Sequence, residues 1–324
     1  MTAPTILDIY GARRRLQGPV KATPLRPAAS LSGATGRPVL LKLESLNLTH
    51  SFKIRGAFNS LLRLIEVHGG ASRCPRVVTA SAGNHGRAMA YAARALGIDL
   101  VVFTPATAPR TKTDAIRQYG AILHADAPDY DQAEARARAV AEKDGAVYIS
   151  PYNHPDVIAG AGTIGLEVIG ECPNATTVVM PLGGGGLASG IGIALRAVAP
   201  GLRIVGVEAD ASTPFTTGLS KGAIATIEAG PTLADGLAGN LEPGSITFPL
   251  VQQVVDEVVT VSEIALIGAM RHMAAEEHLI VEGSSAVALA ALESDRVRRG
   301  SGPIVVIVSG ANIDLPAFLA AASS

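Results

Sequence analysis

The sequence predicts an α/β fold in which two open, parallel-sheet lobes are covered by helices. Short β-branched runs alternate with alanine-rich helical runs for most of the length, and the β-type runs are almost continuously apolar, as in strands that are buried on both faces. The 324 residues also exceed the size, roughly 250–300 residues, at which a single hydrophobic core stops growing. Two lobes with separate cores are therefore expected.

The expected elements alternate in a regular order. In the first half we expect strands at 39–43, 77–80, 100–103, 121–123 and 147–149, and helices at 54–64, 87–96, 113–119, 132–143 and 162–169. The second half repeats the scheme, with strands at 177–180, 203–207, 258–260 and 304–308 and a helix that ends at 198.

A soft domain boundary is predicted at 150–155, where Pro151 and Pro155 mark a connection that cannot be regular helix. We expect a small domain at 51–150 and a large domain made of 1–50 plus 151–324. The stretch 214–249 is rich in glycine and proline, which indicates a loop-rich excursion near a site.

Composition points to a small-molecule partner. The chain is 17% charged with a net charge of −1 and has no run of five like charges, so it lacks the electrostatic footprint of a protein that binds nucleic acid or anionic lipid. Cys74 and Cys172 have neither a C-x-x-C partner nor a paired histidine, so the sequence supports neither a disulfide nor a zinc framework. With no leader-like N-terminus and no apolar stretch of about 20 residues, a cytoplasmic protein is expected.

Lys53 is the first candidate for chemistry. It stands in Ser51-Phe52-Lys53, at a turn between a predicted strand and a predicted helix. An amine whose pKa is lowered by burial or by a cationic neighbour becomes a nucleophile, most commonly in a Schiff base with a carbonyl cofactor. Taken alone, the motif fits a surface lysine better, because short motifs recur by chance.

A glycine-rich loop is the second candidate. Gly183, Gly184, Gly185 and Gly186 follow a predicted strand and open a predicted helix, so their backbone N–H groups suit a phosphate. There are two alternatives. The loop is either merely flexible, or it is a degenerate dinucleotide fingerprint formed by Gly183, Gly185 and Ala188. We expect no acidic residue at the end of the next strand within about 20 residues, which disfavours the dinucleotide.

The third candidate is a loop that runs from Ser81 through Ala82, Gly83, Asn84 and His85 at another strand-to-helix junction. Its hydroxyl, its amides and the dipole of the next helix together suit a carboxylate, so we expect it to bind the substrate. Asn84 and His85 can also be read as a helix cap. A fourth candidate, Ser309, places a hydroxyl at the carboxyl end of a buried strand, where ligands bind in open α/β sheets.

Together these segments resemble the fold-type II pyridoxal-phosphate enzymes, whose architecture is that of the tryptophan synthase β chain, and in particular the group of serine/threonine dehydratases (ammonia-lyases) and serine racemases. The similarity covers nearly the whole chain in family order, through 22–25, 41–44, 51–56, 81–86, 183–186, 232–236, 281–283 and 309–312. The resemblance implies pyridoxal 5'-phosphate as cofactor, bound by the large domain, and a homodimer.

The resemblance also implies a role for each matching residue. Lys53 would form the Schiff base and carry the proton at Cα, and Asn84 would bond the 3-oxygen of the ring. Ser309 would face the ring nitrogen, where a hydroxyl makes the cofactor a weaker electron sink than a carboxylate would and so favours elimination. The other implied cofactor-binding residues are Phe52 and Gly236 on the ring faces, Gly183, Gly184, Gly185, Gly186 and Leu187 at the phosphate, and Glu282.

The implied reaction is loss of a β-hydroxyl from an amino acid to give a 2-oxo acid and ammonia. Candidate substrates are L-threonine, L-serine, 3-hydroxyaspartate, phenylserine and a hydroxyectoine-derived amino acid. Racemisation of serine or aspartate is the alternative within the family, but Ala82 stands where racemases of this group carry a second serine. Lys53-Ile54-Arg55 resembles dehydratases rather than enzymes of β-replacement. An α/β protein that binds a nucleotide without pyridoxal phosphate is the alternative from another class.

Three further features concern the site and its regulation. His50 adds a titratable group near the cofactor, where it is either substrate-specific or structural. No metal is expected, because Glu208 matches one ligand of racemase-like relatives but Pro214 replaces the next, with Asp210 as the remaining alternative. The regulatory extension of biosynthetic threonine dehydratases is not expected, nor is end-product feedback.

Overall fold

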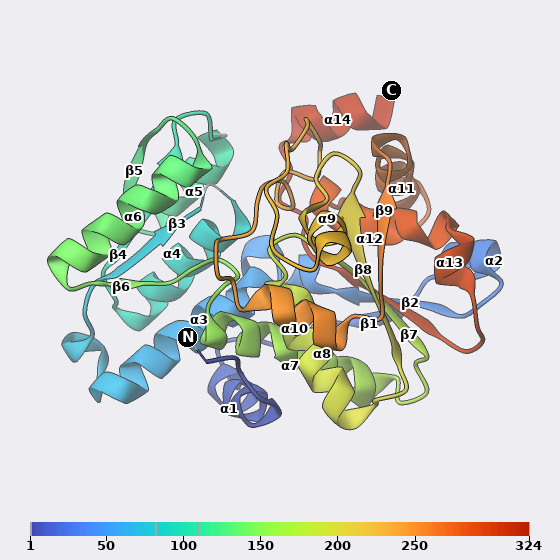
Figure 1. Cartoon of the computed structure of the whole chain (residues 1–324), viewed down its shortest axis with the longest axis horizontal. Coiled ribbons are helices and arrows are strands. Elements are labelled where there is room, and N and C mark those ends of the chain that lie inside the picture. The colour runs from blue at the N-terminus through green and yellow to red at the C-terminus, as the bar shows by residue number, and fades with distance from the viewer. Residues whose placement is uncertain (1, 82, 109, 324) are drawn as a thin grey trace.

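Two α/β lobes lie side by side in the computed structural model, which describes residues 2–81, 83–108 and 110–323 apart from the side chain of Thr111 (Figure 1). The smaller lobe, green and cyan in Figure 1, contains a parallel sheet with strand order β5-β4-β3-β6. The elements of this lobe are α3 (Lys53–His68), β3 (Val77–Ala80), α4 (Asn84–Leu96), β4 (Leu100–Pro105), α5 (Arg110–Gln118), β5 (Ile122–Ala127), α6 (Tyr130–Asp144) and β6 (Val147–Tyr148).

The larger lobe contains a sheet with strand order β1-β2-β10-β7-β8-β9. Its strands are β1 (Leu25–Pro27), β2 (Val39–Leu43), β7 (Thr177–Pro181), β8 (Arg203–Ala209), β9 (Glu257–Val261) and β10 (Ile304–Val308). Its helices are α1 (Ile6–Leu16), α2 (Ala29–Thr35), α7 (Pro155–Glu171), α8 (Gly186–Val198), α9 (Pro214–Lys221), α10 (Thr247–Val254), α11 (Glu263–Ala275), α12 (Gly283–Ala290), α13 (Asp295–Arg298) and α14 (Leu315–Ser323).

The predicted fold class is confirmed, with one correction to the sheets. β1 pairs with β2 in the antiparallel direction, so the larger sheet is mixed rather than wholly parallel. β1 lies at the edge of the sheet, where Pro27 is tolerated because an edge strand pairs with a neighbour on one side only. The smaller sheet takes its strands from 77–148 and the larger from outside that range. The domain limits 51–150 and 1–50 plus 151–324 stay a prediction.

Several element limits differ from the expected ones, because tertiary contacts extend the helices. α4 begins three residues earlier than predicted, at Asn84, and α3 begins at Lys53 itself, so that lysine is helical rather than in the turn. Pro155 is the first residue of α7 and not part of an irregular connection, since proline is tolerated at that position. In the predicted excursion, α9 and α10 form at the two ends and 222–246 is irregular.

Close helix packing sets the site. α7 lies against both α3 and α8, and glycines allow the approach. A Cβ atom at Gly160 of α7 would lie 2.6 Å from the Arg55 carbonyl oxygen, and one at Gly190 of α8 would overlap the Ile158 carbonyl oxygen. Because α7 holds both neighbours at backbone distance, it places the first residue of α3, Lys53, relative to the first residue of α8, Gly186.

An ionic network joins α3 and α7 to β2 and to the turn that follows it. Arg55 contacts Glu44 at 2.8 Å (Nη2 to Oε1) and Glu167 at 2.6 Å (Nη1 to Oε1). Lys42 contacts Glu167 at 2.7 Å and Glu171 at 3.0 Å. Removing one partner of its buried pair, Arg55 and Glu44, leaves an uncompensated charge, so the network holds α3 in one orientation.

Candidate active site

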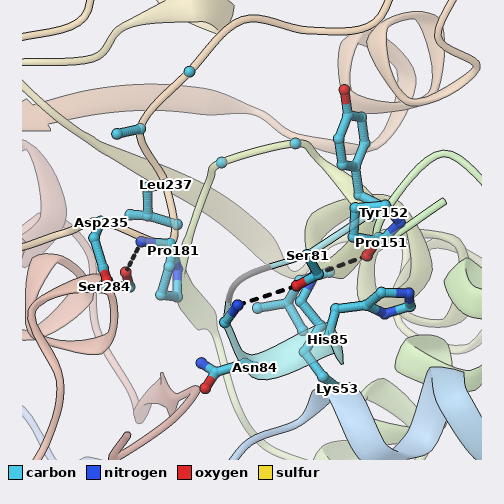
Figure 2. Close-up of a pocket in the computed structure, with 18 of the residues that line it drawn as sticks. Lys53, Ser81, Asn84, His85, Pro151, Tyr152, Pro181, Asp235, Leu237 and Ser284 are labelled. Atoms are coloured by element: carbon cyan, nitrogen blue, oxygen red, sulfur yellow. Dashed lines mark hydrogen bonds between the residues drawn. The ribbon is translucent and has the colours of Figure 1, made fainter. Parts of the chain in front are cut away.

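A cavity of about 460 Å³ lies where the two lobes meet (Figure 2), and the described residues predicted to bind the cofactor or the substrate line it, whereas His50 does not. These residues are Phe52, Lys53, Ser81, Gly83, Asn84, His85, Gly183, Gly184, Gly185, Gly186, Leu187, Gly236, Glu282 and Ser309. Ala82 lies outside the described residues. Ser81, Gly183 and Ser309 follow β3, β7 and β10, so the cavity is at the carboxyl ends of strands from both sheets.

Lys53 places an amine at the cavity wall. Its Nζ atom donates a 2.7 Å hydrogen bond to the carbonyl oxygen of Pro151 and lies 5.1 Å from the ring centroid of Phe52. Burial lowers the pKa of Lys53 to about 8, against the opposing charge of Glu282. A substantial fraction of this amine is therefore neutral near physiological pH, as a nucleophile or a base requires.

The glycine loop presents unused donors. Within the described part of the chain, the N–H groups of Gly183, Gly184, Gly185 and Gly186 donate to no protein acceptor. They stand at the N-terminal end of α8, whose dipole also favours an anion. These groups leave room for a phosphate at this end of the cavity, and the phosphate role of the loop stays a prediction.

The glycines also allow the loop to pack closely on its neighbours, which the sequence did not show. A Cβ atom at Gly184 would overlap the ring of Tyr152, and one at Gly183 would lie 2.9 Å from the side chain of Leu237. Gly185 adopts φ of 82°, which side chains rarely allow. The loop is therefore closely packed on Tyr152 and Leu237, which argues against the alternative of a flexible loop.

One argument against a dinucleotide was wrong. Glu208 stands near the end of β8, the strand that follows the loop, although no acidic residue was expected there. Both of its carboxylate oxygens accept hydrogen bonds from the start of α9, at 2.7 Å from Phe215 N and 2.9 Å from Thr216 N. Glu208 therefore caps α9, and it is absent from the described lining of the cavity.

Ser81, Gly83, Asn84 and His85 line the cavity, and hydrogen bonds hold the side chains of this loop. Ser81 Oγ accepts a 3.2 Å bond from Gly83 N. Asn84 is the first residue of α4 and makes no cap, since Gly83 is the N-cap, so the capping alternative is wrong. Burial and the charge of Lys53 hold the pKa of His85 well below its usual value, and this side chain is therefore neutral.

Glu282 contacts Asn84 at the cavity wall. Its Oε1 accepts a 2.7 Å bond from Asn84 Nδ2. Burial, assisted by the charge of Asp235, raises the pKa of Glu282 to about 7. Ser309 lines the same cavity, and its carbonyl oxygen accepts a 3.0 Å bond from Phe52 N, which ties the end of β10 to the start of α3.

Sequence reasoning missed several lining residues. Asp235 lies in the segment 232–236 that resembles the family, but it was not predicted to line the site. Lys112 of α5 forms an ion pair with it, and nothing in the local sequence indicates this contact. Ser284 follows Glu282 by two positions, and its Oγ accepts a 2.9 Å bond from Gly236 N. Tyr152 was read only as part of a connection, yet its ring lies at the glycine loop (Figure 2).

His50 was expected near the cofactor, and the structure corrects this. The residue is exposed and does not belong to the cavity lining in the described chain. Its φ of 57° is unusual for a residue with a side chain, and its carbonyl oxygen accepts a 3.0 Å bond from Ala311 N. The backbone of His50, rather than its side chain, supports the site. Across the described residues no helix is long and apolar enough to span a bilayer.

Comparison with known proteins identifies the family. Residues 16–310 match the family model described as pyridoxal-phosphate dependent enzyme. L-threonine ammonia-lyase of Thermotoga maritima is 39% identical over 311 residues, which cover 96% of this chain and 76% of that protein. Maize serine racemase superposes with a TM-score of 0.91 and 34% identity, over 98% of this chain and 97% of that one. The threonine deaminase of T.th. has a TM-score of 0.88 and 35% identity, over 96% and 99%. The chain therefore belongs to the pyridoxal-phosphate dependent enzymes of fold type II.

Proposed function

We propose that this enzyme removes the β-hydroxyl of a small, uncharged hydroxy amino acid, L-threonine or L-serine, to give a 2-oxo acid and ammonia. The observation that carries the proposal is the single cavity in which Lys53 meets two helix N-termini, those of α4 and α8. One helix end suits the substrate carboxylate and the other suits a phosphate. Relatives named threonine ammonia-lyase and threonine deaminase support the reaction class.

The chain's residues fit pyridoxal 5'-phosphate. Four free N–H groups suit its phosphate, the NH2 group of Asn84 suits the 3-oxygen, and the hydroxyl of Ser309 suits the ring nitrogen. Phe52 and Gly236 stand at the cavity wall as the proposed neighbours of the ring. When bound, the cofactor supplies an aldehyde for a Schiff base and a ring that withdraws electrons from Cα.

Lys53 has two proposed tasks, to hold the cofactor and then to accept the Cα proton at Nζ. The carbonyl oxygen of Pro151 orients Nζ, and burial keeps the pKa of the amine near 8, within reach of a general base at neutral pH. The hydroxyl of Ser309 does not stabilise a positive charge as a carboxylate would. Elimination is therefore favoured over reactions that need a long-lived carbanion.

The charges of the cavity favour an uncharged substrate side chain. Its described acidic residues are Asp129, Asp131, Asp235 and Glu282. Its described basic residues are Lys53 and Lys112, and Lys112 is already paired with Asp235. A carboxylate on the substrate side chain would meet net repulsion, so 3-hydroxyaspartate fits less well than threonine or serine.

The test is a panel of β-hydroxy amino acids with detection of 2-oxo acid and ammonia. The panel contains L-threonine, L-serine, 3-hydroxyaspartate, phenylserine and a hydroxyectoine-derived amino acid, with Lys53→Ala as the inactive control. We expect the highest kcat/KM for threonine or serine. A purified protein that takes up no added cofactor into a visible Schiff-base band would refute the proposal and favour the nucleotide-binding alternative.

Racemisation is the second candidate, favoured by the close superposition on maize serine racemase. Ala82, where racemases of this group have a serine, speaks against it. Formation of D-serine from L-serine faster than release of the 2-oxo acid would replace the dehydratase proposal by the racemase.

We further propose a cytoplasmic homodimer. Apolar side chains of α11 and α14, which pack together, are exposed at Ile264 (84%), Leu315 (60%) and Leu319 (52%) and offer surface for a second copy to cover. Light scattering at micromolar concentration tests the dimer. A monomeric mass would exclude it.

A further inference from the structure

A chain of side-chain hydrogen bonds runs from α4 to the cavity wall. Arg87 Nη1 donates to Asn312 Oδ1 at 2.8 Å. Asn312 Nδ2 donates to Asn84 Oδ1 at 2.6 Å and to the Thr49 carbonyl oxygen at 2.9 Å. Asn84 Nδ2 then donates to Glu282 Oε1 at 2.7 Å. Arg87 lies one helical turn beyond Asn84 on α4, and Asn312 follows β10.

Two groups with fixed roles, the guanidinium of Arg87 and the carbonyl of Thr49, determine which atom donates in each of these hydrogen bonds. A guanidinium only donates, so the atom of Asn312 that faces Arg87 is its oxygen. The NH2 group of Asn312 therefore faces the Thr49 carbonyl, which only accepts, and the Asn84 side chain. It follows that Asn84 presents its oxygen to Asn312 and its NH2 group to Glu282 and the cavity.

We propose that Arg87 and Asn312 are positioning residues, which hold the Asn84 amide with its NH2 group toward the cofactor. The inference rests on the proposed role of Asn84 at the 3-oxygen. One hydrogen of that NH2 group is used by Glu282, and the second remains for the cofactor. Neither Arg87 nor Asn312 lines the main cavity, so both act through Asn84.

The reversed amide is the state that Arg87 and Asn312 exclude. With Asn84 turned over, its oxygen would face the carboxylate of Glu282 and the anionic 3-oxygen of the cofactor, and three acceptors would share one site. Its NH2 group would meanwhile face the NH2 group of Asn312. Both ends would lose hydrogen bonds in a half-buried place, where an unpaired polar group is still costly.

The experiment compares substitutions that break the relay with others that keep it. Asn312→Ala removes the donor to Asn84 without adding charge, and Asn312→Asp keeps the shape but turns the donor into an acceptor. Arg87→Met removes the group that orients Asn312, whereas Arg87→Lys restores a donor there. Asn174→Asp, on an exposed loop, is the matched control. The readouts are the Kd of the apoenzyme for pyridoxal 5'-phosphate and the pH midpoint of the visible band without substrate.

We expect Asn312→Ala, Asn312→Asp and Arg87→Met to raise the Kd at least tenfold. They should also move the pH midpoint upward, because the anionic 3-oxygen loses a donor. Arg87→Lys and Asn174→Asp should resemble the wild type. Folding of each variant is checked by thermal unfolding of the apoenzyme. If a variant unfolds, the comparison of Arg87→Met with Arg87→Lys carries the test.

Two outcomes refute different statements. Folded Asn312→Ala and Arg87→Met proteins with wild-type Kd and an unshifted midpoint would overturn the relay and leave the proposed reaction intact. A wild type that forms no visible band with the cofactor would instead overturn the proposed function, and the relay with it.

Discussion

Lys53 Nζ lies 2.7 Å from the carbonyl oxygen of Pro151, so the amine at the start of α3 is held by the segment that leads into α7. The same α7 packs against α3, which begins at Lys53, and against α8, which begins at the glycine loop. One helix thus sets the distance between the Lys53 amine and the glycine loop. This relationship explains why the predicted site residues, far apart in the chain, meet in one place.

The rate at which Lys53 captures the cofactor should rise with pH. Its midpoint should lie near pH 8 rather than near 10.5, the ordinary pKa of a lysine. The neutral amine is the attacking form, and burial lowers the pKa of Lys53 to about 8. The measurement is the initial rate of visible-band formation in apoenzyme between pH 6 and 11.5. Lys53→Ala should show no band, and a midpoint above 10 in the wild type would contradict the buried amine.

Glu282→Gln should stabilise the cofactor-free protein at alkaline pH. The pKa of this carboxyl is about 7 in the folded protein against 4.5 ordinarily. Below pH 4.5 both states keep the proton, and between 4.5 and 7 only the unfolded chain releases it, so rising pH favours unfolding. Above pH 7 the loss of folding free energy caused by ionising the buried carboxyl is complete, and it is on the order of 3 kcal/mol.

Chemical denaturation of wild type and Glu282→Gln at pH 4, 6 and 8 tests this. The stability difference should be near zero at pH 4 and grow toward pH 8. Glu142→Gln, an exposed position on α6, is the matched control and should show no such trend. A pH-independent difference for Glu282→Gln would mean that this carboxyl ionises normally.

Asp235→Asn should change substrate preference. The substitution releases Lys112 from its ion pair and leaves a cation free at the cavity wall. A substrate side chain with a carboxylate then finds a partner, so kcat/KM for 3-hydroxyaspartate should rise relative to threonine by about tenfold, which corresponds to roughly 1.4 kcal/mol.

The control for this change is Asp114→Asn, which breaks an exposed ion pair with Arg117 on the same helix as Lys112. It should leave the ratio unaltered. The double change of Asp235→Asn with Lys112→Met should return the ratio to that of the wild type. If the double variant keeps the new preference, Lys112 is not the cause.

Gly184→Ala should weaken cofactor binding and destabilise the fold by about 1–3 kcal/mol, the usual cost of overpacking. The added methyl group would overlap the ring of Tyr152 and push the loop out of place. Gly170→Ala, near the end of α7, has open space at the same atom and should be neutral or slightly stabilising. Thermal unfolding and the Kd for the cofactor distinguish the two, and equal behaviour would mean that the loop tolerates the displacement.

Elements with one strong local signal were predicted within a residue or two. The strands 77–80 and 304–308 have the limits of β3 and β10, because an apolar β-branched run ends there at small or polar residues. The start of α4 was missed, since asparagine, histidine and glycine are poor helix formers. Contacts of Asn84 with Glu282 and Asn312 outweigh that local preference.

By itself the sequence determined the fold class, the family and the candidate set at the cavity, because these depend on local periodicity and on motifs in order. Only the tertiary structure decided that Glu208 caps α9, that His50 is exposed outside the cavity lining and that Lys112 is paired with Asp235. It also decided the direction of the Asn84 amide, through partners more than 190 residues away in the chain. The physical reason is that pKa values, ion pairs and hydrogen-bond direction depend on distance in space, which a local pattern of residues does not contain.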